Sequence, residues 1–154
     1  MLRRANLEDA SAVHRVHMAS IRGLALEKYS AEQVEAWCGG RTPENYHSPI
    51  TEQFVLVAEQ EGRVVGFAQL DAKRATVVAV YVEPGFTRRG VGLKLLRALE
   101  EQALSVGLSE LSLQASLNAV EFYASAGYAT GELSQHFVGR GVSLPCIAMS
   151  RALR

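Results

Sequence analysis

The chain has 154 residues, of which 48% are hydrophobic and 21% are charged, as in ordinary soluble globular proteins. Its 16 basic and 16 acidic residues cancel, which argues against a protein that coats nucleic acid or another polyanion. No apolar run approaches the roughly 20 residues that cross a bilayer, and the N-terminus lacks the apolar stretch of a signal peptide, so we expect a cytoplasmic protein without a membrane partner.

The N-terminal segment predicts a short strand followed by a helix. Residues 2–5 form the candidate strand. Asn6 is typical of a helix cap, with Asp9 at the position where a capping box has Glu or Gln. Mostly apolar residues then recur at helical spacing. The inward face of this helix is expected to consist of Ala10, Val13, Val16, His17, Ser20 and Ile21.

A second helix is expected to begin at Ser30 and to end at Gly39-Gly40. Beyond it, Pro43 and Pro49 indicate a loop. From residue 54 the hydrophobic period changes from helical to strand-like.

Three strands are predicted next, as an antiparallel meander. Residues 54–59 and Arg63–Asp71 flank the turn Glu61-Gly62 and together predict a hairpin. The third strand is Thr76–Val82, which is rich in valine.

The C-terminal half predicts alternating helices and strands. An amphipathic helix follows Gly92 and stops at Gly107. Residues 111–115 alternate as a strand, which we expect to run parallel to Thr76–Val82 because a helix crossover separates the two. A short helix at 118–125 and strands near 128–133 and 144–151 complete the chain.

This order predicts an α+β fold: one domain over residues 1–154, with a mixed, mostly antiparallel sheet of about seven strands and about four helices on both faces. Cys38 and Cys146 have neither metal-ligand spacing nor the pattern of a disulfide framework. We therefore expect a reducing environment and no metal.

A glycine turn between the Thr76–Val82 strand and the next helix is the strongest candidate site. A helix N-terminus exposes unpaired backbone N–H groups and partial positive charge, which suits a phosphate-bearing ligand. The residues of this turn are Arg88, Arg89, Gly90, Val91, Gly92 and Leu93. The alternative is a turn whose glycines only let the helix pack closely. A dinucleotide fingerprint or P-loop is disfavoured, because the third glycine and the Gly-Lys-Ser/Thr sequence are missing.

A second segment, with Phe122-Tyr123 shortly before Gly127-Tyr128, gives the turn a context. Together the two segments resemble the GNAT superfamily of CoA-dependent N-acetyltransferases, whose phosphate-binding motif is Gln/Arg-x-x-Gly-x-Gly/Ala. Three shorter pieces are similar to a YafP-type bacterial branch of that superfamily: Lys28-Tyr29-Ser30, Glu35-Ala36-Trp37 and Gly141-Val142.

The resemblance implies a GNAT-like fold, acetyl-CoA as cosubstrate and an amine as acetyl acceptor. It implies that residues 88–93 hold the pyrophosphate and that the main chain of Val80, Tyr81 and Val82 binds pantetheine like an added strand. Asn118 is either a cofactor contact or a plain helix cap. Thr87 departs from the motif, because it stands where the family has Gln or Arg.

Tyr123 is the candidate catalytic acid. A phenol has a pKa of about 10 and a thiol of about 8.5, so a phenol keeps its proton until a departing CoA thiolate needs it. The alternative is a tyrosine that only packs in the core.

The general base is not identified by the sequence, although Asp71, Glu121, His47 and His136 are candidates. Tyr29, Trp37 and Tyr46 are expected to line the acceptor pocket, with core packing as the alternative for Trp37. Three basic residues would favour an acidic acceptor if they lay nearby: Lys28, His136 and Arg140.

Two alternatives to acetyl transfer stay open. One is transfer of another short acyl chain on the same fold, and the other is a non-catalytic module that binds acyl-CoA. GNAT proteins often pair, so the resemblance also leaves room for a homodimer, although no sequence feature requires one.

Overall fold

A computed structural model describes residues 1–139 and 141–153. Seven strands form one sheet in the order β1-β2-β3-β4-β5-β7-β6. The strands are β1 (Leu2–Arg4), β2 (Phe54–Gln60), β3 (Arg63–Asp71), β4 (Thr76–Val82), β5 (Glu110–Ser116), β6 (Ala129–Gly139) and β7 (Val142–Ala152). The α-helices are α1 (Ala10–Leu24), α2 (Ala31–Cys38), α3 (His47–Glu52), α4 (Val91–Ser105) and α5 (Val120–Ser125).

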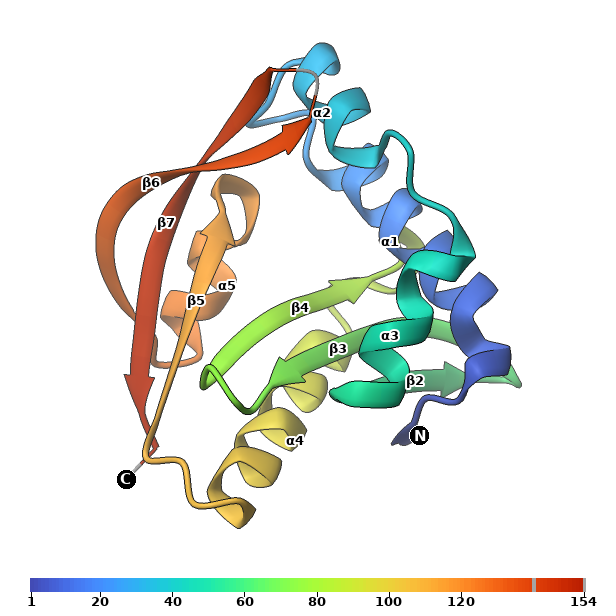
Figure 1. Ribbon diagram of the computed structural model, residues 1–154, viewed down its shortest axis with the longest axis vertical. Coiled ribbons are helices and arrows are strands. Elements are labelled where there is room, and N and C mark those ends of the chain that lie inside the picture. The colour runs from blue at the N-terminus through green and yellow to red at the C-terminus, as the bar shows by residue number, and fades with distance from the viewer. Residues whose placement is uncertain (140, 154) are drawn as a thin grey trace.

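The predicted mixed sheet is confirmed. All neighbouring strands pair antiparallel except β4 and β5, which pair parallel. In Figure 1, β2, β3 and β4 form one half of the sheet, and the long β6–β7 hairpin rises from the other half towards α2.

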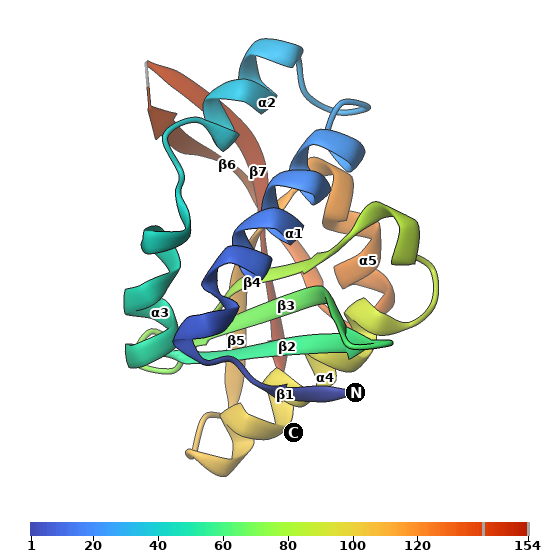
Figure 2. The ribbon, with the colours of Figure 1, turned by 90° about the vertical axis from the view of Figure 1, so that its right-hand side faces the viewer.

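Helices cover both faces of the sheet, as predicted (Figure 2). On one face, α4 and α5 pack on the largest apolar cluster, which includes Leu95, Leu96, Leu99, Leu111 and Leu113. On the other face, α1 packs with Tyr46 and Ile50 on β2, β3 and β4. A third cluster joins the end of α1 and α2 to Leu144 of β7. The sheet therefore lies between two helical layers.

Local signals near the N-terminus act as the sequence predicts. The side chain of Asn6 accepts a hydrogen bond from the N–H of Glu8, and the carboxylate of Asp9 accepts one from the N–H of Asn6, which completes a capping box. Ser30 and Gln33 form a second capping box at the start of α2, and Gly39 ends that helix.

The loop predicted around the two prolines was wrong. Residues Pro43–Tyr46 form a 3-10 turn, and α3 follows at once. Pro43 occupies the first position of the turn, and Pro49 lies in the first turn of α3. Both are positions where a helix does not need the missing N–H group. Prolines at the start of helices had the same sequence signature as prolines in a loop.

The last hairpin is longer than predicted. β6 continues to Gly139, because β7 begins at Val142 and the ladder extends through the pair His136–Leu144. In the described residues, no helix is long and apolar enough to cross a membrane.

Candidate functional site

β4 and β5 form a wedge that opens towards the C-terminal ends of both strands. Within the described residues, their one parallel pair is Thr76 with Ser112, and the N–H of Ser112 also donates to the carbonyl of Ala75 at 3.0 Å. Beyond this point β5 pairs with β7 and β4 pairs with β3. The facing edges of the two strands thus keep main-chain groups available to an extended ligand.

A β-bulge at Val78 shapes the β4 side of the wedge. Gln69 pairs with Ala79 and Leu70 pairs with Val77, so Val78 is the extra residue. The bulge reverses the alternation of side chains: Val77 lies in the α4 cluster, whereas Ala79 lies in the α1 cluster.

The main chain of β4 alternates between β3 and the wedge. The N–H of Glu83 donates to the carbonyl of Val65 at 2.8 Å, so Glu83, and Tyr81 two residues before it, direct their backbone groups towards β3. The backbone groups of Val80 and Val82 therefore point into the wedge. Tyr81 differs from its predicted role, because its main chain faces β3 while its side chain lines a cavity.

The glycine turn forms the N-terminus of α4. Gly90 is the N-cap residue with φ of 80°, and Arg88 also has a positive φ of 64°. Among the described residues, no hydrogen bond engages the N–H groups of residues 88–93, and the first bond of the helix runs from the N–H of Lys94 to the carbonyl of Gly90. Six N–H donors at a helix N-terminus, flanked by the exposed Arg88 and Arg89, are an arrangement that suits an anion.

The side chains of this turn have different roles. Val91 is buried and Leu93 is 43% exposed. A Cβ at Gly92 would lie 3.3 Å from the ring of Phe122, so this glycine lets α5 approach α4. Gly92 therefore allows close packing of the two helices, in addition to its position in the motif. The alternative that the glycines serve helix packing holds for this residue.

Thr87 does not substitute for the longer side chain of the motif. Its hydroxyl donates to the carbonyl of Pro84 at 3.0 Å and so closes the preceding turn. Arg89 lies over the ring of Phe86, at 5.2 Å from its centroid. The residues that remain to meet an anion are the backbone N–H groups and the two arginines.

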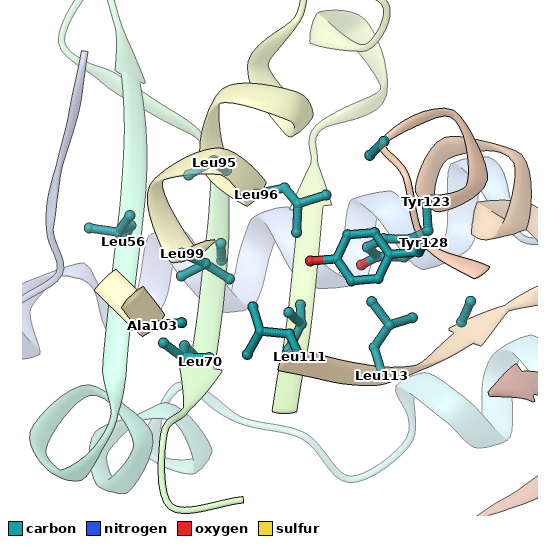
Figure 3. Packing of buried hydrophobic residues seen from close by; sticks show 14 of the residues in the cluster. Leu56, Leu70, Leu95, Leu96, Leu99, Ala103, Leu111, Leu113, Tyr123 and Tyr128 are labelled. Atoms are coloured by element: carbon teal, nitrogen blue, oxygen red, sulfur yellow. The ribbon is translucent and has the colours of Figure 1, made fainter. Parts of the chain in front are cut away.

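Tyr123 lies in the cluster between α4, α5 and β5 (Figure 3). Its ring contacts those of Phe122 and Tyr128, with centroids 5.0 and 5.8 Å away. Burial raises the pKa of Tyr123 above its ordinary value, which keeps the phenol protonated at neutral pH. Tyr128 has a different task, since its hydroxyl donates to Glu100 at 2.8 Å.

Asn118 is exposed and does not cap a helix, so the interpretation as a plain cap was wrong. The candidate bases are scattered. Asp71 accepts bonds from the N–H groups of Lys73 and Arg74 in the β3–β4 turn, Glu121 and His47 are exposed, and only His136 lines the cavity.

The cavity has a volume of about 400 Å³ and opens onto the wedge, because its wall includes Val78 of β4 and Gln114 of β5. Tyr29, Trp37 and Tyr46 line it, and Trp37 also packs in the third apolar cluster, so the core-packing alternative holds for Trp37 as well. The hydroxyl of Tyr29 donates to the carbonyl of Pro145 at 2.7 Å and accepts from the N–H of Leu117 at 2.8 Å, which ties the wall to β7 and to the turn before α5.

Two further residues of the cavity were not singled out by the sequence. His17 was assigned only to the inward face of α1, and Arg41 follows the glycines after α2 without any motif. The one available signal was a titratable residue on an otherwise apolar helix face. Three basic residues were expected to favour an acidic acceptor if they lay near the pocket. Of these, His136 lines the cavity, Lys28 does not, and Arg140 lies outside the described residues.

Comparisons with known proteins point to one family. The family model of the GNAT acetyltransferase domain matches residues 25–150. The uncharacterized N-acetyltransferase YafP of Escherichia coli K12 is 27% identical over 115 residues, which cover 75% of this chain and 71% of that protein.

Two solved structures have a similar fold. A GCN5-related N-acetyltransferase from Rhodopseudomonas palustris is 33% identical, with a TM-score of 0.93 over 99% of this chain and 94% of that one. The PaiA N-acetyltransferase of Thermoplasma acidophilum, solved in complex with coenzyme A, is 21% identical, with a TM-score of 0.82 over 99% and 98% of the two chains. The similarity to the PaiA enzyme, at 21% identity, shows a shared fold.

Proposed function

The chain belongs to the GNAT acetyltransferase family, and we propose that it moves an acetyl group from acetyl-CoA to a primary amine by direct attack in a ternary complex. One observation carries the proposal: the unpaired N–H groups of residues 88–93 stand beside the wedge that leads past Val80 and Val82. A diphosphate at the turn would direct the rest of a CoA-like molecule into that wedge. The coenzyme A complex of the PaiA enzyme supports the same cosubstrate here.

The residues then take these roles. The N–H groups of Arg88, Arg89, Gly90, Val91, Gly92 and Leu93 bind the pyrophosphate, with the two arginine charges beside them. The main chains of Val80 and Val82 bind pantetheine as an added strand. Asn118, exposed at the turn before α5, is a further cofactor contact.

Tyr123 protonates the leaving group. The amine attacks the carbonyl carbon of the acetyl thioester, and the sulfur leaves as a thiolate. This thiolate needs a proton. Burial keeps the Tyr123 phenol protonated until then. The ammonium loses one proton to water before it attacks, and the second N–H proton, which leaves as the amide forms, returns through water to the Tyr123 phenolate. The cavity and the wedge hold amine and carbonyl carbon at about 3–3.5 Å from each other.

Calorimetry and a thiol-release assay test the proposal. The folded protein should bind CoA and acetyl-CoA, and a panel of primary amines should include at least one that releases thiol from acetyl-CoA. Faster release from succinyl-CoA would favour transfer of another acyl group. Binding without release by any amine would favour a non-catalytic module, and absence of binding would overturn the proposal.

A further inference from the structure

The cavity beside the wedge carries positive charge and no negative charge in the part of the chain that the structure describes. Arg41 contributes to its wall, whereas no Asp or Glu does. Among residues 1–139 and 141–153, Arg41 forms no ion pair. An acceptor with a second positive charge would find no carboxylate in this wall, but an acceptor with a negative charge would find a guanidinium.

Arg41 acts on the groups at one end of this cavity. Burial raises the pKa of Tyr46, and the charge of Arg41 opposes that rise. The same charge acts in the same direction on Tyr81 and disfavours protonation of His17. The backbone of Arg41 is held in place as well, because its carbonyl lies 3.1 Å from Nε2 of His14.

His17 supplies a second, independent observation. Its side chain is buried, with 6% of its surface exposed, and Nδ1 lies 2.7 Å from the hydroxyl of Tyr46. Nε2 is the buried side-chain polar atom that has no hydrogen-bond partner within the described residues. A buried polar atom without a partner is costly, and a hydrogen bond to a ligand would remove that cost.

The polarity of this pair follows from the neighbouring charge. Burial lowers the pKa of His17 to about 3, so its imidazole is neutral and carries one hydrogen. The positive charge of Arg41 favours a hydroxyl of Tyr46 that turns its oxygen towards the guanidinium, and we therefore assign the hydroxyl hydrogen to the bond with Nδ1 of His17. The imidazole hydrogen then resides on Nε2, whose own surface is covered by its neighbours, so a small rotation of the ring would bring this donor to the cavity that His17 lines.

We infer that the acetyl acceptor is a small amine that also carries a carboxylate, as an amino acid does, and that Arg41 and Nε2–H of His17 bind this carboxylate. The inference rests on the proposed acetyl transfer. A carboxylate accepts hydrogen bonds from both a guanidinium and a neutral N–H. The volume of about 400 Å³ suits a small molecule, and the rings of Trp37 and Tyr81 offer an apolar wall for its side chain.

Matched pairs of acceptors test the inference on the full chain. Each amino acid is compared, in the thiol-release assay, with the amine that lacks its carboxylate. Arg41→Gln should raise KM for the amino acid about 10- to 100-fold, while KM for the decarboxylated amine and Kd for CoA stay unchanged. Arg22→Gln is the control, since Arg22 pairs with Glu35 and does not line the cavity.

Variants of His17 separate its hydrogen bond from its packing. Gln places an amide N–H near the position of Nε2, so His17→Gln should retain the preference for the carboxylate, whereas His17→Leu should lose it. A thermal melt reports whether each variant folds. If His17→Leu does not fold, the result with Arg41→Gln alone decides whether the inference holds.

The outcomes separate the inference from the proposed function. Two results would overturn the inference alone. One is that decarboxylated amines are acetylated with the same kcat/KM as the matching amino acids, and the other is that Arg41→Gln leaves KM for the amino acid unchanged. Absence of thiol release with every amine would instead count against acetyl transfer itself.

Discussion

The ring of Phe122 packs directly against Gly92, so a Cβ at that glycine would lie 3.3 Å from both Cε1 and Cζ of the ring. This contact joins the N-terminus of α4 to α5. Since Phe122 precedes Tyr123, the same contact links the glycine turn at residues 88–93 to the candidate acid.

Substitution of Gly92 should disturb both regions. Gly92→Val forces Phe122 to move, and we expect the free energy of unfolding to fall by about 1–3 kcal/mol, which is roughly 2–4 °C in Tm for each kcal/mol. Turnover should fall as well. Gly85→Val is the control, because a Cβ there meets nothing within 4 Å. Equal melting temperatures for the two variants would contradict the contact.

Tyr123→Phe should separate chemistry from binding. The ring stays in its cluster, but the proton donor is lost, so kcat should fall by about 10²- to 10⁴-fold with Kd for CoA unchanged. The control is Tyr128→Phe, which removes the hydrogen bond to Glu100. That variant should lose stability, by about 1.5–3 kcal/mol, and keep its turnover. Full activity of Tyr123→Phe would show that this tyrosine only packs in the core and does not act as the acid.

Gly90→Ala tests the backbone of the turn. Gly90 has a φ of 80°, and a Cβ there would meet nothing within 4 Å, so the substitution costs only backbone strain. That strain amounts to about 1–2 kcal/mol. Any relaxation of the turn moves its N–H groups, and CoA should bind up to about tenfold more weakly. Gly107→Ala, with a φ of 90° and equally open space at the far end of α4, should show the same loss of stability and unchanged CoA affinity. Calorimetry on the pair decides between the turn and a general effect of strain.

Asp9 should give the protein part of its stability above acid pH. Hydrogen bonds from Arg3, and then from the N–H of Asn6, lower the pKa of Asp9 in the folded state below its ordinary 3.8. A carboxyl with a lowered folded-state pKa stabilises above the unfolded-state value and loses that contribution as pH falls through the folded-state value. Asp9→Asn should therefore lower the free energy of unfolding at pH 7 by about 1.5–3 kcal/mol.

Urea titrations at neutral pH and below about pH 4 measure this effect. The gap between the parent protein and Asp9→Asn should narrow in acid. Glu8→Gln, at the exposed neighbouring position, should change little at either pH. A gap that stays constant with pH would show that the Asp9 carboxylate is not held by Arg3 in solution.

Periodicity and local turn chemistry were sufficient to predict most of the fold. The valine-rich β4 and the amphipathic α4 follow from residues that are close in sequence. The bulge at Val78 could not be predicted, because residues 77–80 are uniformly apolar and show no preference for either face of the sheet. Its consequence, the cavity-facing side chain of Tyr81, was missed for the same reason.

The candidate site also has one part that the sequence predicts and one part that it does not. The turn at Gly90 is a local motif and was visible in the sequence, whereas the cavity end is tertiary. His17 of α1 and Arg41 of the segment after α2 both line the cavity, and no spacing in the chain encodes that proximity. The aromatic residues Tyr29, Trp37 and Tyr46 of the same cavity were predicted, whereas His17 and Arg41 were found only in three dimensions.

The parallel pair of Thr76 and Ser112, the one between β4 and β5 in the described part of the chain, also bears on what can be observed in solution. Beyond it, side-chain packing beneath the wedge, rather than backbone ladder bonds, determines how far apart the two edges stand. Amide protons of Val80 and Val82 should therefore exchange with deuterium rapidly in the ligand-free protein and slowly once a strand-like ligand bridges the edges. Deuterium uptake at two valines would then report occupancy of the wedge with no need for turnover.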